Sequence, residues 1–270
     1  MLRQRVMTAV IGVLVLVIIV FLLPPAVALA CYAAAIVFAA WEWSALVRLD
    51  GHLARVAYVA AIAAMMALAS HYAVAPGIYR QLLILTAVWW LLALVWLAFF
   101  PERVSRAGAA IAGALVLVPA WITLSQLQLR EDRGPQLVFY VLCLVWAADI
   151  GAYFIGRRFG QRRLAPRVSP SKTWEGVAGG VAGAALIAAV GAQLFAAPLL
   201  AFVLLSIGVA IASIVGDLTE SMFKRFAGLK DSGNFIPGHG GILDRIDSVT
   251  AAVPLFVLGL AFLGESVWSA

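Results

Sequence analysis

The chain has 270 residues, of which 64% are hydrophobic and 12% are charged, and its mean hydropathy is +1.03. A soluble protein of this length needs roughly 25% charged residues on its surface, so this composition excludes an ordinary soluble enzyme and indicates a protein embedded in lipid. The net charge of +6 does not require a nucleic-acid partner, because arginines at the ends of membrane spans explain it. Both cysteines, Cys31 and Cys143, lie inside apolar runs and predict no disulfide or metal site.

Nine apolar runs of about 20 residues follow one another along the chain, and each predicts a membrane-spanning helix. Because backbone groups in lipid must pair internally, the predicted fold is an all-α, polytopic transmembrane helical bundle. The first run lacks a clear cleavage site, so it is expected to be a retained helix and not a signal peptide. The runs lie at residues 6–23, 26–47, 56–75, 81–100, 107–125, 136–156, 176–194, 197–216 and 248–264.

The basic residues predict a cytoplasmic N-terminus. With that orientation, 16 of the 19 lysines and arginines fall in cytoplasmic segments, where basic residues concentrate. The same topology places two polar loops, 157–175 and 217–247, on the cytoplasmic side, where soluble nucleotides are found. Glycine and charge are more frequent in the second half, so we expect an N-terminal scaffold half, 1–135, and a catalytic half, 136–270, within one membrane domain.

Five acids and four bases are concentrated in the 31 residues from 217 to 247. If the preceding helix continues through Phe226, Asp217 and Lys224 share one of its faces, and a second helix that begins near Gly241 adds further acids. Carboxylates suit a hard cation, while bases and glycine turns suit phosphate oxygens. A charged loop is usually only solvated, but these acids begin at the very end of a span, where ionised groups tend to be functional.

The spacing of these residues resembles a known signature. The pattern is Ser221-x-x-Lys224-Arg225, then Lys230-Asp231, then Pro237-x-His239-Gly240-Gly241-x-x-Asp244-Arg245-x-Asp247. It is similar to that of the phosphatidate cytidylyltransferase (CDP-diacylglycerol synthase) family, and the segment 169–176 also resembles that family. The likeness is close in the C-terminal half, whereas the N-terminal half shares only the general character of many membrane spans.

The resemblance implies that the chain transfers CMP from CTP to phosphatidic acid in the membrane lipid, giving CDP-diacylglycerol and pyrophosphate. It also implies Mg²⁺, K⁺ beside it, a homodimer and an active site on the cytoplasmic face of a bacterial inner membrane. Asp217, Lys224 and Asp244 are the implied catalytic residues, and Asp217, Asp244 and Asp247 the implied metal ligands. The implied substrate contacts are Ser171, Lys172, Thr173, Ser221, Arg225, Lys230, Asp231, Ser232, His239, Gly240, Gly241 and Arg245.

Several assignments stay open at this point. Asp149, an acid inside a span, is equally a site residue or a structural partner, and His239 has no assigned role. Glu42, between two tryptophans near the end of a run, is expected to lie at the membrane interface. A CTP-dependent polyprenol or dolichol kinase is the alternative enzyme. A transporter is less favoured, because it predicts charges scattered at mid-span.

Overall fold

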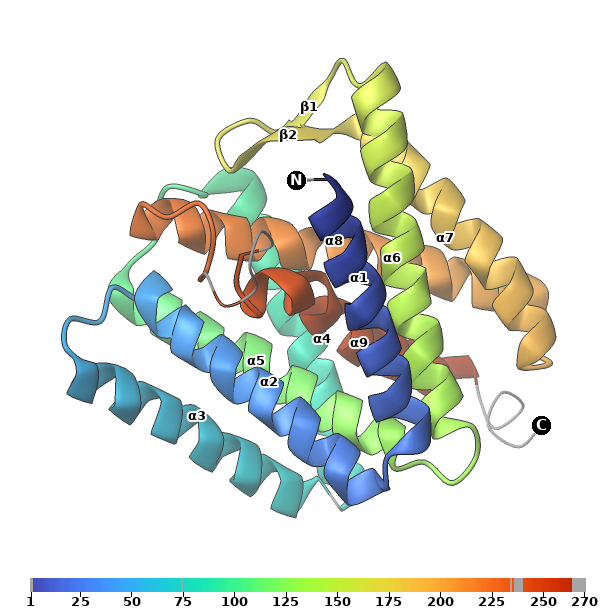
Figure 1. Cartoon of the computed structure of the whole chain (residues 1–270), viewed down its shortest axis with the longest axis horizontal. Coiled ribbons are helices and arrows are strands. Elements are labelled where there is room, and N and C mark those ends of the chain that lie inside the picture. The colour runs from blue at the N-terminus through green and yellow to red at the C-terminus, as the bar shows by residue number, and fades with distance from the viewer. Residues whose placement is uncertain (1, 74, 234, 236–239, 264–270) are drawn as a thin grey trace.

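The computed structural model describes residues 2–73, 75–233, 235 and 240–263 (Figure 1). Eight of its helices, α2 to α9, are long and apolar enough to cross a membrane, and α1 with its π-helical continuation η1 contributes a shorter apolar segment, Val10–Leu22. The elements are α1 (Leu2–Val17), η1 (Ile18–Leu22), α2 (Pro25–Leu46), α3 (His52–Tyr72), α4 (Pro76–Phe99), α5 (Arg106–Gln128), α6 (Gly134–Phe159), β1 (Arg163–Ala165), β2 (Ser169–Thr173), α7 (Trp174–Leu194), α8 (Leu199–Ala227) and α9 (Leu243–Leu263).

The first predicted run falls on α1 with η1 and each of the other eight falls on one helix, so the prediction of a helical membrane protein is confirmed. The expected extension of the eighth run is also confirmed, because α8 continues to Ala227 and ends at Gly228, whose positive φ of 73° is typical of a helix C-terminus. The antiparallel hairpin of β1 and β2 was not predicted. Its strands pair Arg163 with Thr173 and Ala165 with Ser169.

Small residues allow α6 and α7 to lie side by side with close backbones (Figure 1). A Cβ atom added at Gly183 of α7 would lie 2.6 Å from the carbonyl oxygen of Ala147 in α6. Only glycine permits such an approach, which is common between helices in membranes. The tight α6–α7 pair fixes the position of the hairpin that connects these two helices.

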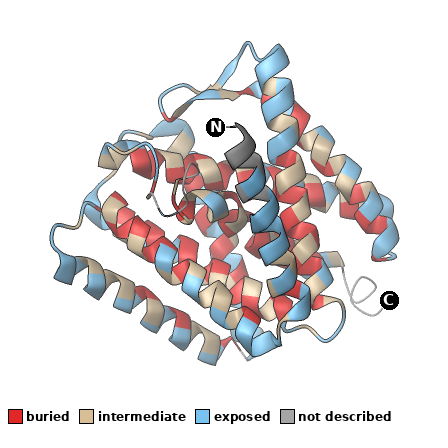
Figure 2. Ribbon diagram, in the orientation of Figure 1, coloured by how far each residue is buried: buried red, intermediate tan, exposed pale blue. Residues whose placement is uncertain are grey.

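Buried residues line the inner faces of helices from both halves of the chain (Figure 2). One cluster joins α2, α4 and α5 to the C-terminal part of α8, where the rings of Trp43 and Phe223 lie 5.3 Å apart. Outward faces carry large apolar side chains such as Leu53 and Leu200, which are 82% and 73% exposed. Such a surface is stable in lipid rather than in water.

Several of the connecting loops that carry charge lie at one end of the bundle. Asp50, after α2, pairs with Arg106 at 3.7 Å, and Glu102, after α4, pairs with Arg167 of the hairpin at 3.6 Å. Arg225, near the end of α8, donates a hydrogen bond to the carbonyl oxygen of Val168 in the hairpin at 3.2 Å. The two polar loops therefore lie on the same side, as alternating spans require.

Candidate active site

The first part of the site joins the hairpin to α8. Lys172, on β2, donates a hydrogen bond from Nζ to Oδ2 of Asp217, and Ser221, one turn further along α8, donates to Oδ1 at 3.3 Å. The side chains of Lys172 and Asp217 are 25% and 27% exposed. Because water reaches both groups, this ion pair can open and exchange partners at modest cost.

The second part joins α8 to α9 and is almost dry. Nζ of Lys224 lies 2.7 Å from Oδ1 of Asp244 and 3.0 Å from Oε1 of Glu220. These three side chains are only 10%, 8% and 2% exposed, in that order. A buried ion pair that loses one partner leaves an uncompensated charge, so this triad is expected to stay together.

Asp244 also organises the start of α9. Its Oδ2 accepts hydrogen bonds from the backbone N–H groups of Ser232 at 3.0 Å and Gly241 at 2.8 Å. A carboxylate is favourable at a helix N-terminus, where backbone N–H groups lack partners within the helix. Both oxygens of Asp244 are thus engaged by the chain itself.

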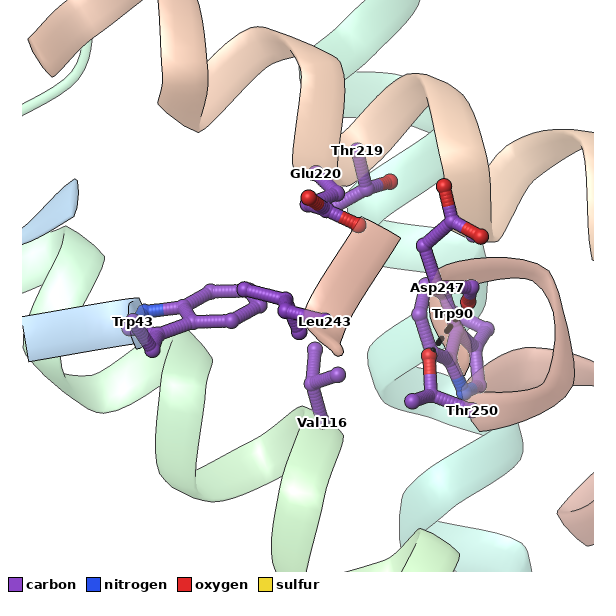
Figure 3. Close-up of a pocket in the computed structure, with 9 residues that line it drawn as sticks. Trp43, Trp90, Val116, Thr219, Glu220, Leu243, Asp247 and Thr250 are labelled. Carbon is purple, nitrogen blue, oxygen red and sulfur yellow. Dashed lines mark hydrogen bonds between the residues drawn. The ribbon is translucent and has the colours of Figure 1, made fainter. Parts of the chain in front are cut away.

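Asp247 lies where α8 and α9 approach each other closely. A Cβ atom added at Gly216 would be 2.7 Å from the carbonyl oxygen of Asp247, so the two helices meet directly beside Asp217. Asp247 and Glu220 line a narrow internal crevice together with the ring of Trp90 (Figure 3). Oδ1 of Asp247 accepts a hydrogen bond from the N–H of Ser248 at 2.7 Å. Asp217 and Asp247 therefore bring one acid from each helix to a common junction.

The chain is similar in sequence to known proteins over its whole length. The model of the family described as the Cytidylyltransferase family matches residues 3–263. The chain belongs to the cytidylyltransferase family. It is 43% identical to a phosphatidate cytidylyltransferase of Pseudomonas aeruginosa over the whole of both chains, and 39% identical to one of Haemophilus influenzae, covering 95% of this chain and 97% of that relative. A Bacillus subtilis phosphatidate cytidylyltransferase is 42% identical over about half of each chain.

The full-length matches confirm the resemblance that the C-terminal signature indicated. They also extend it to the N-terminal half, where the sequence motifs alone carried no detailed likeness.

The acids fit a magnesium ion of the kind that binds with its substrate. Within the described ranges, no three acidic, histidine or cysteine side chains are grouped at metal-ligand spacing. Mg²⁺ commonly needs only one or two carboxylates, because waters and substrate phosphates supply the other ligands. Asp217 and Asp247 provide such a pair, and Asp244, the third predicted ligand, accepts hydrogen bonds from Lys224 and from two backbone N–H groups. Asp149 of α6 lies within electrostatic range of Asp217 and Lys172.

The hairpin residues of the family signature have different surroundings. Thr173 is buried, and its Oγ1 accepts a hydrogen bond from the N–H of Gly176 at 3.1 Å, which makes it the N-cap of α7. Ser171 is exposed beside Lys172. The structure therefore gives Thr173 a structural partner, while Ser171 remains available to a ligand.

The segment after α8 presents several predicted residues to solvent. Lys230 and Asp231 are exposed, as are Arg225 and Arg245. Ser232, by contrast, is only 6% exposed and donates its hydroxyl hydrogen to Glu42 at 3.1 Å. Gly240 has a positive φ of 81° and Gly241 is buried, whereas His239 lies outside the described residues.

Glu42 lies near the end of α2, as expected, but its side chain faces the protein interior. Its side chain is buried, at 6% exposure, and receives hydrogen bonds from the segment that precedes α9. The tryptophans on either side of it indicated an interfacial position. The better signal was the carboxylate itself, because an ionisable side chain within an apolar run usually has a partner inside the protein.

Proposed function

We propose that the chain transfers CMP from CTP to phosphatidic acid, forming CDP-diacylglycerol and pyrophosphate. Full-length likeness to relatives named phosphatidate cytidylyltransferase supports this activity. The structural observation that carries it is the junction of Asp217 and Asp247, with Lys172 bonded to Asp217 at the end of the bundle where the polar loops gather.

In this reaction an oxygen of the lipid phosphate attacks the α-phosphorus of CTP. The bond between the α-phosphorus and the bridging oxygen breaks, and pyrophosphate leaves with that oxygen. The attacking oxygen is already anionic, so no general base is needed, and positioning and charge neutralisation supply the rate.

Asp217 and Asp247 would hold Mg²⁺, which neutralises the triphosphate charge. Lys172 exchanges Asp217 for a substrate phosphate, since its ion pair is partly exposed. Lys230 and Arg225 are exposed bases that attract the triphosphate. Lys224 and Asp244 keep α8, α9 and the intervening segment in register.

The proposed setting is a bacterial inner membrane, with nine spans, a cytoplasmic N-terminus and the site on the cytoplasmic side. The distribution of basic residues supports this orientation, and the bacterial origin of the relatives supports the membrane. The family resemblance supports K⁺ beside Mg²⁺, and it also supports a homodimer. Size-exclusion chromatography with light scattering tests the homodimer.

The test uses purified protein with CTP, Mg²⁺ and phosphatidic acid in mixed micelles. We expect CDP-diacylglycerol by mass spectrometry and an equal amount of pyrophosphate. Asp217→Asn should abolish both products, while Asp50→Asn, which removes an 88% exposed acid that pairs with Arg106, should not. Absence of lipid-linked CMP from the wild type, or full activity of Asp217→Asn, would overturn the proposal.

A further inference from the structure

Glu42 belongs to α2, far from the catalytic signature in sequence, yet its carboxylate binds the segment that leads into α9. Oε1 accepts a hydrogen bond from the N–H of Ile242 at 3.1 Å. Oε2 accepts one from the N–H of Leu243 at 2.7 Å and one from Oγ of Ser232 at 3.1 Å. The three donors lie 190 to 201 positions away along the chain.

The surroundings are built to admit this carboxylate. A buried carboxylate is strongly unfavourable unless hydrogen bonds and positive charge compensate it. Here the compensation comes from the three donors and from the N-terminus of α9, which begins at Leu243 and carries partial positive charge. Cβ atoms added at Gly233 or Gly241 would collide with the Glu42 carboxylate, so both positions leave the space that it occupies.

Ser232 connects Glu42 to the acids of the site. Its hydroxyl donates to Glu42, while its backbone N–H donates to Oδ2 of Asp244. Asp244 in turn accepts a hydrogen bond from Lys224 of α8. A continuous buried network therefore runs from α2 through the connecting segment and α9 to α8, and each member depends on the geometry of the next.

We propose that Glu42 is a positioning residue for the reaction: it holds Ser232 and the first turn of α9, and thereby sets where Asp247 stands opposite Asp217. This inference rests on the proposed function. Its role is positioning and not contact with substrate, because its carboxylate is buried and accepts three hydrogen bonds from the chain itself. The N-terminal half thus contributes directly to the geometry of the site.

The decisive variant is Glu42→Gln, which keeps the size of the side chain. A carboxylate offers two accepting oxygens, whereas an amide offers one oxygen and an NH₂ group. In either orientation of the amide, its NH₂ group faces a backbone N–H group, that of Ile242 or that of Leu243. The two donors then oppose each other. The first turn of α9 must shift, and a small shift at a catalytic centre lowers the rate far more than it lowers binding.

Three further variants separate positioning from general stability. Ser232→Ala removes one donor to Glu42 and leaves the backbone intact. The double variant Glu42→Gln with Ser232→Ala tests whether the two act through one contact. Gln128→Leu is the matched control, because Gln128 is also buried and bridges helices, through the Val20 carbonyl oxygen and the Tyr32 hydroxyl, without touching this segment.

The experiment measures CDP-diacylglycerol formation against CTP and Mg²⁺, together with hydrogen–deuterium exchange at the amides of Ile242 and Leu243. For Glu42→Gln we expect kcat/KM to fall at least about ten-fold, mainly through kcat, and the half-saturating Mg²⁺ concentration to rise. Exchange should accelerate about ten-fold at whichever of the two amides faces the NH₂ group, because that amide loses its acceptor. Ser232→Ala should give a smaller loss, and the double variant should lose less than the product of the two single losses.

Gln128→Leu should lower the unfolding temperature and leave kcat, Mg²⁺ dependence and exchange at these amides unchanged. The inference is overturned if Glu42→Gln keeps kcat/KM within about two-fold of the wild type, or if amide exchange is unchanged. If Glu42→Gln does not fold, Ser232→Ala carries the same test. A wild type that makes no CDP-diacylglycerol contradicts the proposed function, whereas the exchange measurement still decides whether Glu42 holds the segment.

Discussion

Replacing Lys224 by methionine probes the buried ion triad that joins α8 to α9. The substitution keeps an unbranched chain of similar length and removes only the charge and the donors. Asp244 and Glu220 then stay behind at 8% and 2% exposure without their common cation. Because Asp244 also binds the N–H groups of Ser232 and Gly241, the damage is expected to spread into the connecting segment.

The size of the effect follows from burial. Breaking a buried ion pair by removing one partner typically lowers the free energy of unfolding by about 3–5 kcal/mol. For a chain of this size, each kcal/mol shifts the unfolding temperature by about 2–4 °C. We therefore expect Lys224→Met to melt about 6–20 °C below the wild type.

The assay is thermal unfolding of detergent-purified protein, followed by intrinsic tryptophan fluorescence. Lys230→Met is the control, since Lys230 is exposed and such substitutions usually change stability by no more than about 0.5 kcal/mol. Adding Glu220→Gln to Lys224→Met should recover part of the loss, because one stranded charge is removed. If Lys224→Met has the same unfolding temperature as Lys230→Met, the triad does not hold the two helices together.

Three other perturbations test separate parts of the structure. Thr173→Ala removes the N-cap of α7 and should lower the free energy of unfolding by about 1 kcal/mol in thermal melts, while CDP-diacylglycerol synthesis continues. Loss of activity without loss of stability would instead show that Thr173 contacts substrate. Gly216→Ala should reduce kcat about ten-fold, because its Cβ meets the Asp247 carbonyl oxygen. Gly208→Ala in the same helix is the control and should leave kcat unchanged, since its Cβ meets nothing within 4 Å. Equal kcat values for the two variants would show that the close approach of the helices is unimportant. Chelation by EDTA should abolish synthesis and Mg²⁺ should restore it, with Asp247→Asn requiring more Mg²⁺ than the wild type; unchanged Mg²⁺ dependence would remove Asp247 from the metal site.

The helices could be predicted from the sequence because lipid imposes both their length and their polarity. The extension of α8 past Gly216 was also predictable, since Asp217, Ser221 and Lys224 recur at helical spacing. The hairpin of β1 and β2 was not, because residues 163–173 show no alternation of apolar and polar side chains.

The site was predicted as a set of residues, but their individual partners were not. A motif does not distinguish Thr173 as a helix cap from Thr173 as a substrate ligand, because both uses need the same hydroxyl. The contact of Glu42 with Leu243 depends on how α2 packs against α9, and no local pattern encodes a pairing across 201 positions. Ser232 likewise reads as a polar loop residue until its burial is known.

In the proposed reaction the α-phosphorus of CTP moves to the lipid phosphate. The most direct measurement gives the purified protein Mg²⁺, phosphatidic acid and CTP labelled in one sample at the α-phosphate and in another at the γ-phosphate. We expect the α label to enter the lipid fraction and the γ label to leave as pyrophosphate. A γ label in the lipid, with CDP released, would contradict it and identify a kinase.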